Sequence, residues 1–130
     1  MMVIIMSSVK PSKVRKRTLY APWHIKNKML NARLSDELRS KYGIKTVRVR
    51  KGDSVKIVRG EYAGVEGKVT SVNIKTGRIT VEGVFRENVR GEQIPVKIHA
   101  SKVIITSLNL DDKLRKERLE SKIGKVEVVK

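Results

Sequence analysis

The chain has 130 residues, of which 39% are hydrophobic and 33% charged, so it suits one small domain with extensions and a modest core. It contains no cysteine, which excludes disulfides, thiolate zinc sites, iron–sulfur clusters and thiol catalysis. Thirty Lys and Arg against 13 Asp and Glu leave a net charge of +17, and this indicates a large polyanion as partner.

Most of the excess charge lies near the N-terminus. Residues 1–51 contain 14 Lys and Arg but only two acids, Asp36 and Glu37, whereas residues 52–110 and 111–130 carry a net +3 and +2. A block of one sign is typical of an arm that binds a polyanion. The apolar residues 1–6 precede this block and are too few for a secretory signal or a membrane span, so we expect a soluble, intracellular protein. Either Met1 or Met6 is the start of translation.

Residues 9–31 are basic with scattered aromatic side chains, and Pro11 and Pro22 interrupt them. No apolar period is long enough to build a core face. The segment is therefore predicted to be an extended arm with one short helix over about residues 22–31. A second helix is predicted to begin at Ser35, with acids in its first turn, and to end at Gly43.

Between residues 46 and 108 apolar residues recur at every second position in short runs separated by glycines, as in Val47 and Val49 or Val55 and Ile57. This pattern predicts several short strands in a small barrel. Pro95 limits its strand to an edge or begins it. Residues 86–93 form a charged hairpin tip, which is either a solvated loop or a finger that contacts RNA or a protein neighbour.

A final helix is predicted from Asp111 to Gly124, with Asp111 and Asp112 each followed four residues later by a base, Arg115 and Lys116. Its apolar residues are too loosely spaced for a coiled coil, which favours a solvated helix stabilised in part by a partner. The expected organisation is a basic N-terminal arm with short helices over residues 1–45, a barrel over residues 46–108, and a C-terminal helix and tail over residues 109–130.

The segment from residue 51 to 69 is the most informative, because it predicts a strand, a glycine-rich loop and a second strand. Gly60 and Gly64 permit positive φ and a close approach of another backbone, and Arg59 and Lys68 place a base at each end of the loop. From the residues alone, a tight barrel turn with incidental glycines is as good an interpretation as an anion-binding loop.

This segment resembles a KOW motif, through Gly52-Asp53-x-Val55 and Gly60-x-x-x-Gly64-x-x-Gly67-x-Val69. The resemblance extends over about residues 9–122 to a protein family of the large ribosomal subunit, the archaeal and eukaryotic long form of the KOW protein numbered twenty-four. It is carried by three further stretches: Arg17-x-x-x-Ala21-Pro22-x-His24-Ile25, Leu34-Ser35-x-Glu37-Leu38-Arg39-x-Lys41-Tyr42 and Ile98-His99-x-Ser101-Lys102-Val103. The sequence departs from the family at Ala63, where a lysine often precedes the glycine, and so lacks any contact made by that side chain.

The resemblance implies a mainly β fold, a small SH3-like barrel, that binds the 5′ domain of large-subunit ribosomal RNA. It also implies an early role in subunit assembly and a position near the exit of the peptide tunnel, with neighbouring ribosomal proteins as further partners. We accordingly expect a cytoplasmic, ribosome-bound protein with no cofactor, no metal, no small-molecule substrate and no membrane contact.

Two other function classes stay open at this stage. A transcription-associated KOW module would bind RNA polymerase and nascent RNA, although such factors usually have a separate domain where this chain has its basic arm. An enzyme such as a nuclease is disfavoured because the sequence has no paired carboxylates at helical spacing, metal-ligand cluster, nucleophile motif or Walker-type loop.

Phosphate contacts from Lys and Arg supply most RNA affinity, and aromatic side chains stack on unpaired bases. For Trp23 the alternative of equal weight is a core anchor that folds back onto the barrel. In the arm, the candidate RNA-binding residues are Lys13, Arg15, Lys16, Arg17, Tyr20, Trp23, His24, Lys26, Lys28 and Arg33. In the predicted barrel they are Arg48, Arg50, Lys51, Arg59, Gly60, Tyr62, Gly64, Lys68, Arg86, Arg90, Lys97, His99 and Lys102.

Overall fold

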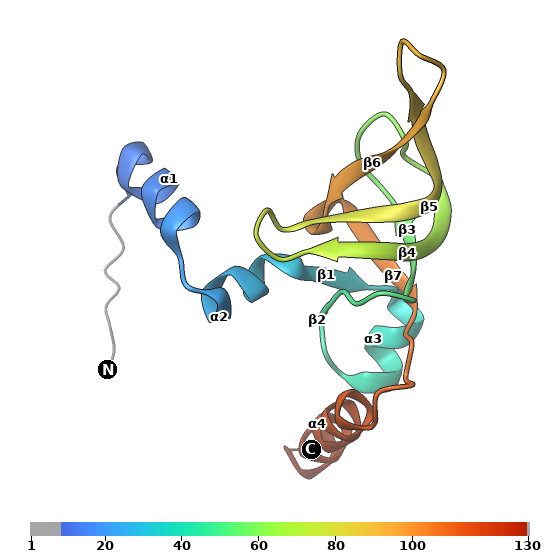
Figure 1. Ribbon diagram of the computed structural model, residues 1–130. Helices are drawn as coiled ribbons and strands as arrows, with labels where there is room; N and C mark the ends of the chain where they lie inside the picture. The colour runs from blue at the N-terminus through green and yellow to red at the C-terminus, as the bar shows by residue number, and fades with distance from the viewer. Residues whose placement is uncertain (1–8, 130) are drawn as a thin grey trace.

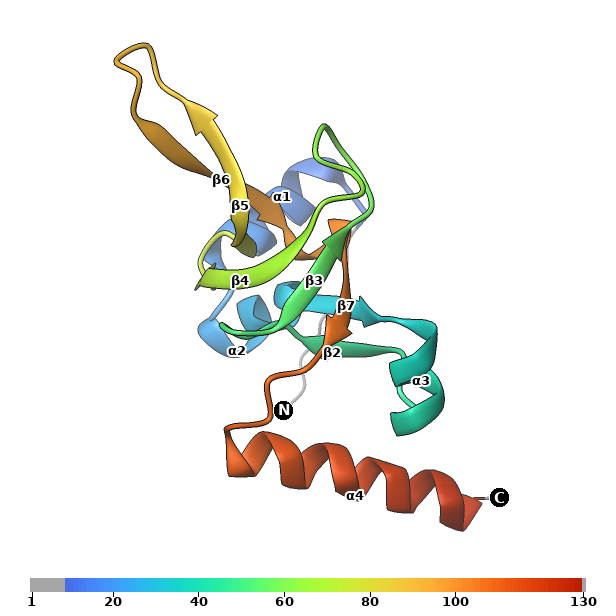
Figure 2. The same cartoon turned by 90° about the vertical axis from the view of Figure 1, so that its right-hand side faces the viewer.

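The computed structural model describes residues 9–129, and side chains as far as residue 123, so the choice between Met1 and Met6 lies outside the described residues. Two N-terminal helices lead into a small, strongly curved β domain, and a long C-terminal helix lies against one end of it (Figures 1 and 2). The expected mainly β fold is confirmed, and the β domain is consistent with an SH3-like barrel. No helix within residues 9–129 is both long and apolar enough to cross a membrane.

The first half of the chain contains α1 (Pro11–Tyr20), α2 (Trp23–Lys26), the 3-10 helix η1 (Asn27–Leu30), β1 (Asn31–Leu34), α3 (Asp36–Tyr42), β2 (Thr46–Arg48) and β3 (Ser54–Ile57). The second half contains β4 (Glu66–Asn73), β5 (Arg78–Glu87), β6 (Gln93–His99), the 3-10 helix η2 (Ala100–Lys102), β7 (Val103–Ser107) and α4 (Lys113–Val129).

The seven strands form one sheet in the order β2-β1-β7-β3-β4-β5-β6. All neighbours are antiparallel except β1 and β7, which run parallel. Pro95 lies in β6, at the edge of the sheet, as the missing backbone N–H of proline requires. Strand β1 was not predicted: it lies in a segment where we expected only helices, and its four residues give too short an alternation to detect.

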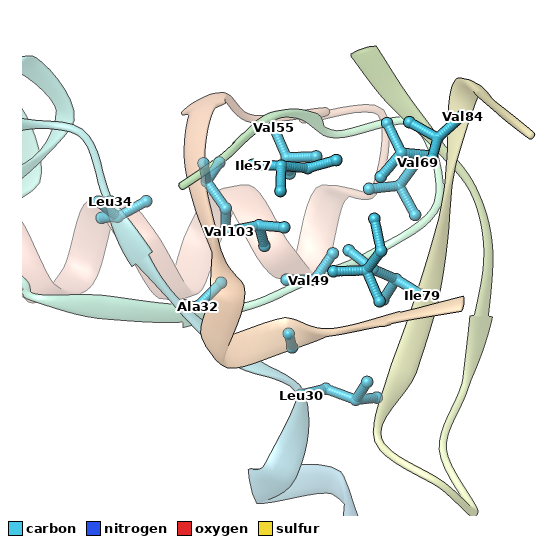
Figure 3. Close-up of a cluster of buried hydrophobic side chains, with 14 residues drawn as sticks. Leu30, Ala32, Leu34, Val49, Val55, Ile57, Val69, Ile79, Val84 and Val103 are labelled. Carbon is cyan, nitrogen blue, oxygen red and sulfur yellow. The ribbon is translucent and has the colours of Figure 1, made fainter. Parts of the chain in front are cut away.

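The barrel interior is aliphatic, as the scarcity of aromatic residues predicts. Figure 3 shows side chains from β1, β3, β4, β5 and β7 meeting in one cluster, which includes Leu34, Val55 and Ile79. Alternation accounts for it, since Val55 and Ile57 point inward from β3 while Lys56 between them is exposed. Leu30, at the end of η1, is also part of this core. The N-terminal segment is therefore joined to the barrel from Leu30 onward.

The helix predicted at Ser35 is α3, and its boundaries are confirmed. Ser35 is the N-cap residue, and Gly43 ends the helix in the left-handed conformation at φ 68°, with its N–H bonded to the carbonyl of Arg39 at 2.8 Å. Leu34 and Tyr42 are buried and Leu38 packs against the core. The shared apolar face of this helix therefore packs as predicted.

Three expectations for the C-terminal helix are wrong. Helix α4 continues past Gly124 to Val129, and neither Asp111–Arg115 nor Asp112–Lys116 forms an ion pair within the described residues. The helix is also not fully solvated, because Arg115 and Leu119 are buried against the rest of the domain. The i,i+4 rule fails here because both Asp112 and Arg115 have partners from distant parts of the chain.

Arg115 reaches Asp53, which is fully buried. Its two terminal nitrogens donate to the two carboxylate oxygens, each at 2.7 Å. The backbone N–H groups of Arg50 and Asn109 donate to the same carboxylate at 3.0 and 2.9 Å. Arg115 also donates to the carbonyls of Asn109 and Arg48, at 2.9 and 3.0 Å. This network joins α4 to the connections on either side of β3 and β7, and leaves neither charge without a partner.

Asp53→Ala tests this network. The substitution leaves the Arg115 guanidinium buried without its counter-charge, so we expect the free energy of unfolding to fall by roughly 3–5 kcal/mol. Urea denaturation followed by far-UV circular dichroism measures it. The matched control Asp111→Asn removes an exposed carboxylate near the start of the same helix and should change the value by at most about 0.5 kcal/mol. Equal losses in the two variants would contradict the structural role of Asp53.

Candidate nucleic-acid interface

The arm differs from the expected extended chain. Residues Pro11–Tyr20 form helix α1, whose first position is occupied by proline, and α2 and η1 then cover the predicted short helix from Trp23 to Leu30. Helix α1 buries no residue and stands away from the barrel in Figure 1. The search for an apolar period missed it because a helix rich in Lys and Arg, which are good helix formers, needs no buried face to show the helical conformation.

The structure decides between the two interpretations of Trp23. Its side chain is 63% exposed and that of Tyr20 is 78% exposed, so Trp23 is not a core anchor. His24 is exposed as well. The arm therefore presents aromatic rings and cations together, with Lys26 half-buried and the other cations exposed: Lys13, Arg15, Lys16, Arg17 and Lys28.

A second group surrounds the segment between β2 and β3. Arg48, Arg50 and Lys51 are exposed, as the alternation predicts. Arg48 and Arg50 also line a hollow of about 310 Å³ between β1, β2 and α4. Arg118 and Lys122 of α4 line the same hollow and were missed from the sequence. Their spacing from Arg115, three and seven residues, places them on one helical face and was the available signal.

Arg50 is held in place by an ion pair with Asp112. The N–H of Leu114 donates to Asp112 at 3.0 Å, and this bond, followed by the Arg50 guanidinium, holds the pKa of Asp112 below its usual range. Asp112 therefore remains ionised, and it neutralises one cation of the group while Arg48 and Lys51 keep their charge.

The glycine-rich loop joins β3 to β4. Gly60 and Gly64 have φ of 93° and 94°, and nothing lies within 4 Å of a Cβ built at either position. Positive φ, which an L side chain adopts at a cost, is thus the reason for glycine within this chain. Arg59 is exposed beside the loop, Lys68 is exposed on β4, and Tyr62 packs against the core. The structure is compatible with both interpretations of the loop.

Strands β5 and β6 extend beyond the barrel as a hairpin, which projects from it in both views (Figures 1 and 2). Arg86 and Arg90 are exposed there, together with the apolar residues Phe85 and Val89. The remaining candidates, Arg33, Lys97 and Lys102, are exposed on β1, β6 and η2. The candidate residues thus lie in separate regions and do not converge on one cleft.

His99, at the end of β6, is half-buried. The backbone N–H of Ser101 donates to its Nδ1 at 3.2 Å, so Nδ1 carries a lone pair and the ring proton of the neutral form is on Nε2. Burial, and after it the charges of Arg78 and Lys102, lowers the pKa of His99 below its ordinary 6.5. Arg78 is Cα-paired with His99 and is a further cation that sequence reasoning missed. Within residues 9–129, no group of three or more His, Asp or Glu could hold a metal ion.

A small β barrel of SH3-like type, with a surface rich in cations and a basic arm, defines the class of protein. Residues 8–122 match the family model for ribosomal proteins described as L26 in eukaryotes and L24 in archaea. The chain belongs to this family of large-subunit ribosomal proteins.

Three relatives with the name large ribosomal subunit protein uL24 illustrate the similarity. The protein of Saccharolobus solfataricus is 53% identical over 115 residues, covering 88% of this chain and 97% of the relative. That of Korarchaeum cryptofilum is 52% identical over 122 residues, covering 94% and 93%. That of Nitrosopumilus maritimus is 44% identical over 115 residues, covering 88% and 68%.

The pKa of His99 predicts a pH dependence of stability. Because the folded-state pKa lies below that of the unfolded chain, the unfolded chain binds more protons as the pH falls below about 6.5, and stability decreases. The urea midpoint should therefore be lower at pH 5.5 than at pH 7.5. His99→Gln should reduce the difference, whereas His24→Gln should retain it. An unchanged difference in His99→Gln would contradict this assignment.

The arm predicts the salt dependence of RNA binding. Removing residues 1–20 deletes five Lys and Arg and ends before Leu30, so the barrel should remain folded. In binding to a 5′-domain transcript of large-subunit rRNA, the slope of log K against log salt should become shallower by about 0.7–0.9 for each phosphate that the arm neutralises. The control Lys113→Gln/Lys116→Gln should change the slope less. A slope equal to that of the full chain would show that the arm does not contact phosphates.

Proposed function

We propose that this chain is a structural, non-catalytic constituent of the large ribosomal subunit that binds the 5′ domain of large-subunit rRNA. It acts early in subunit assembly and lies near the exit of the peptide tunnel, beside neighbouring ribosomal proteins, bound to the ribosome in the cytoplasm. The observation that carries the proposal is the match to the ribosomal family over residues 8–122, joined to a surface on which cations are exposed from the arm to the barrel.

The distribution of charge supports RNA as the partner. Asp53 is buried against Arg115, and Asp112 is paired with Arg50, so two carboxylates that border the barrel's cations do not face a ligand as free anions. Arg48, Lys51 and Arg59 are exposed. A phosphate backbone passing these side chains meets cations and releases counter-ions, which is the main source of sequence-independent affinity.

The exposed aromatic residues support contact with unpaired bases. Tyr20 and Trp23 stand on a thin helical arm that folded RNA can accommodate in a crevice between helices. Stacking of one base on such a ring contributes about 1–3 kcal/mol. Phosphate binding by the neighbouring lysines and arginines then fixes the arm in register. The choice of the 5′ domain, the assembly role and the tunnel-exit position rest on the family resemblance alone.

Sedimentation of a native cell extract in high salt tests the proposed function. Many phosphate contacts within folded RNA should keep the protein on the large subunit at salt concentrations that remove loosely bound basic proteins. We expect it to migrate with the large subunit through the gradient. Its presence at the top of the gradient, or with RNA polymerase, would contradict the proposal and favour a transcription-associated KOW module.

A further inference from the structure

An open groove lies between the segment that follows β2 and the middle of β4. Its volume is about 690 Å³, within the range of roughly 300–1,000 Å³ that ligand sites occupy. Four aliphatic side chains line it: Leu30, Val49, Val72 and Ile74. Leu30 and Val49 belong to the buried core, and Val72 and Ile74 are half-buried against it. The groove therefore has an apolar surface that the core holds in place.

A β-bulge shapes one wall of the groove. The register of β4 against β5 shifts between Val69 and Ser71, and Thr70 is the additional residue. As a result Thr70 and Ser71 both reach the hydroxyl of Thr80, at 2.7 and 2.6 Å, instead of pointing to opposite faces. Each hydroxyl keeps an acceptor lone pair, since a hydroxyl has one donor and two acceptor sites. Exposed acceptors thus border the apolar surface.

Cations form the other wall. Arg48, Arg50 and Lys51 line the groove, and no carboxylate does. The side chains of Arg48 and Lys51 make no hydrogen bond or ion pair with any residue of the described chain, whereas Arg50 is fixed by Asp112. A ligand that complements this groove has an apolar, planar or compact part for the floor and negative charge close beside it.

We propose that this groove binds one unstacked nucleotide of single-stranded RNA, with the base on the aliphatic floor and its flanking phosphates at Arg48 and Lys51. The proposal rests on the proposed function, because it names the part of the RNA that this surface takes. Charge complementarity favours RNA over a basic protein segment, which three cations would repel. A duplex does not fit the same chemistry, since its bases are stacked and paired and only its phosphates reach the protein.

Methyl NMR of the full-length protein tests the proposal. The probe is a single-stranded uridine hexanucleotide, and the matched probe is an abasic ribose-phosphate hexamer of equal charge. The methyl signals of Val49, Val72 and Ile74 should shift with the hexanucleotide and stay in place with the abasic hexamer and with an RNA duplex. Equal shifts with the abasic hexamer or the duplex, or no shift with the hexanucleotide, would overturn the proposal.

A pair of variants gives an independent readout. Ser71→Glu places a carboxylate in the groove at an exposed position of β4, and it should weaken hexanucleotide binding at least tenfold. Ser107→Glu makes the same change at an exposed position of β7 outside the groove, and about a twofold loss is expected. Equal losses in the two variants would overturn the proposal.

Binding of the unmodified protein to the 5′-domain transcript separates the two ideas. Transcript binding without methyl shifts in the groove overturns the nucleotide site and leaves the proposed function standing. Absence of transcript binding overturns the proposed function itself.

Discussion

The buried ion pair between Asp53 and Arg115 is the interaction on which the rest of the structure depends. A carboxylate with no exposed surface is stable only when every oxygen is satisfied, and here two guanidinium nitrogens and two backbone N–H groups meet that demand. The four groups come from three separate parts of the chain. Their common need for one carboxylate fixes the segment before β3, the segment after β7 and the first turns of α4 relative to one another.

This arrangement has a consequence for function. The acid of the Gly52-Asp53 pair is withdrawn into the interior, and Asp112 is paired at the surface with Arg50, so the cations around the β2–β3 segment dominate its outer face. The same network holds α4 close to that segment, where Arg118 and Lys122 add to Arg48 in the adjacent hollow. One structural device therefore both closes the end of the barrel and concentrates positive charge beside it.

How much the sequence could predict depended on whether a feature was local. Alternation at Val55 and Ile57, and the capping pattern from Ser35 to Gly43, report local geometry, and both predictions are confirmed. Helix α1 shows no amphipathic period because it buries nothing, and strand β1 is too short to show one. The pairing of Asp53 with Arg115, 62 residues away, replaced the predicted helical pairs because burial makes a distant bidentate partner stronger than an exposed local one. The groove beside Val72 depends on a bulge that the sequence does not signal.

A high-resolution cryo-electron microscopy map of the large subunit from the organism that makes this protein tests the central claim most directly. The account predicts that the arm around Trp23 and the face carrying Arg48 and Lys51 contact phosphates and bases of the rRNA 5′ domain, with Asp53 still paired to Arg115 in the interior. A map in which the arm and that face are exposed to solvent, or in which the protein is absent from the subunit, would contradict it.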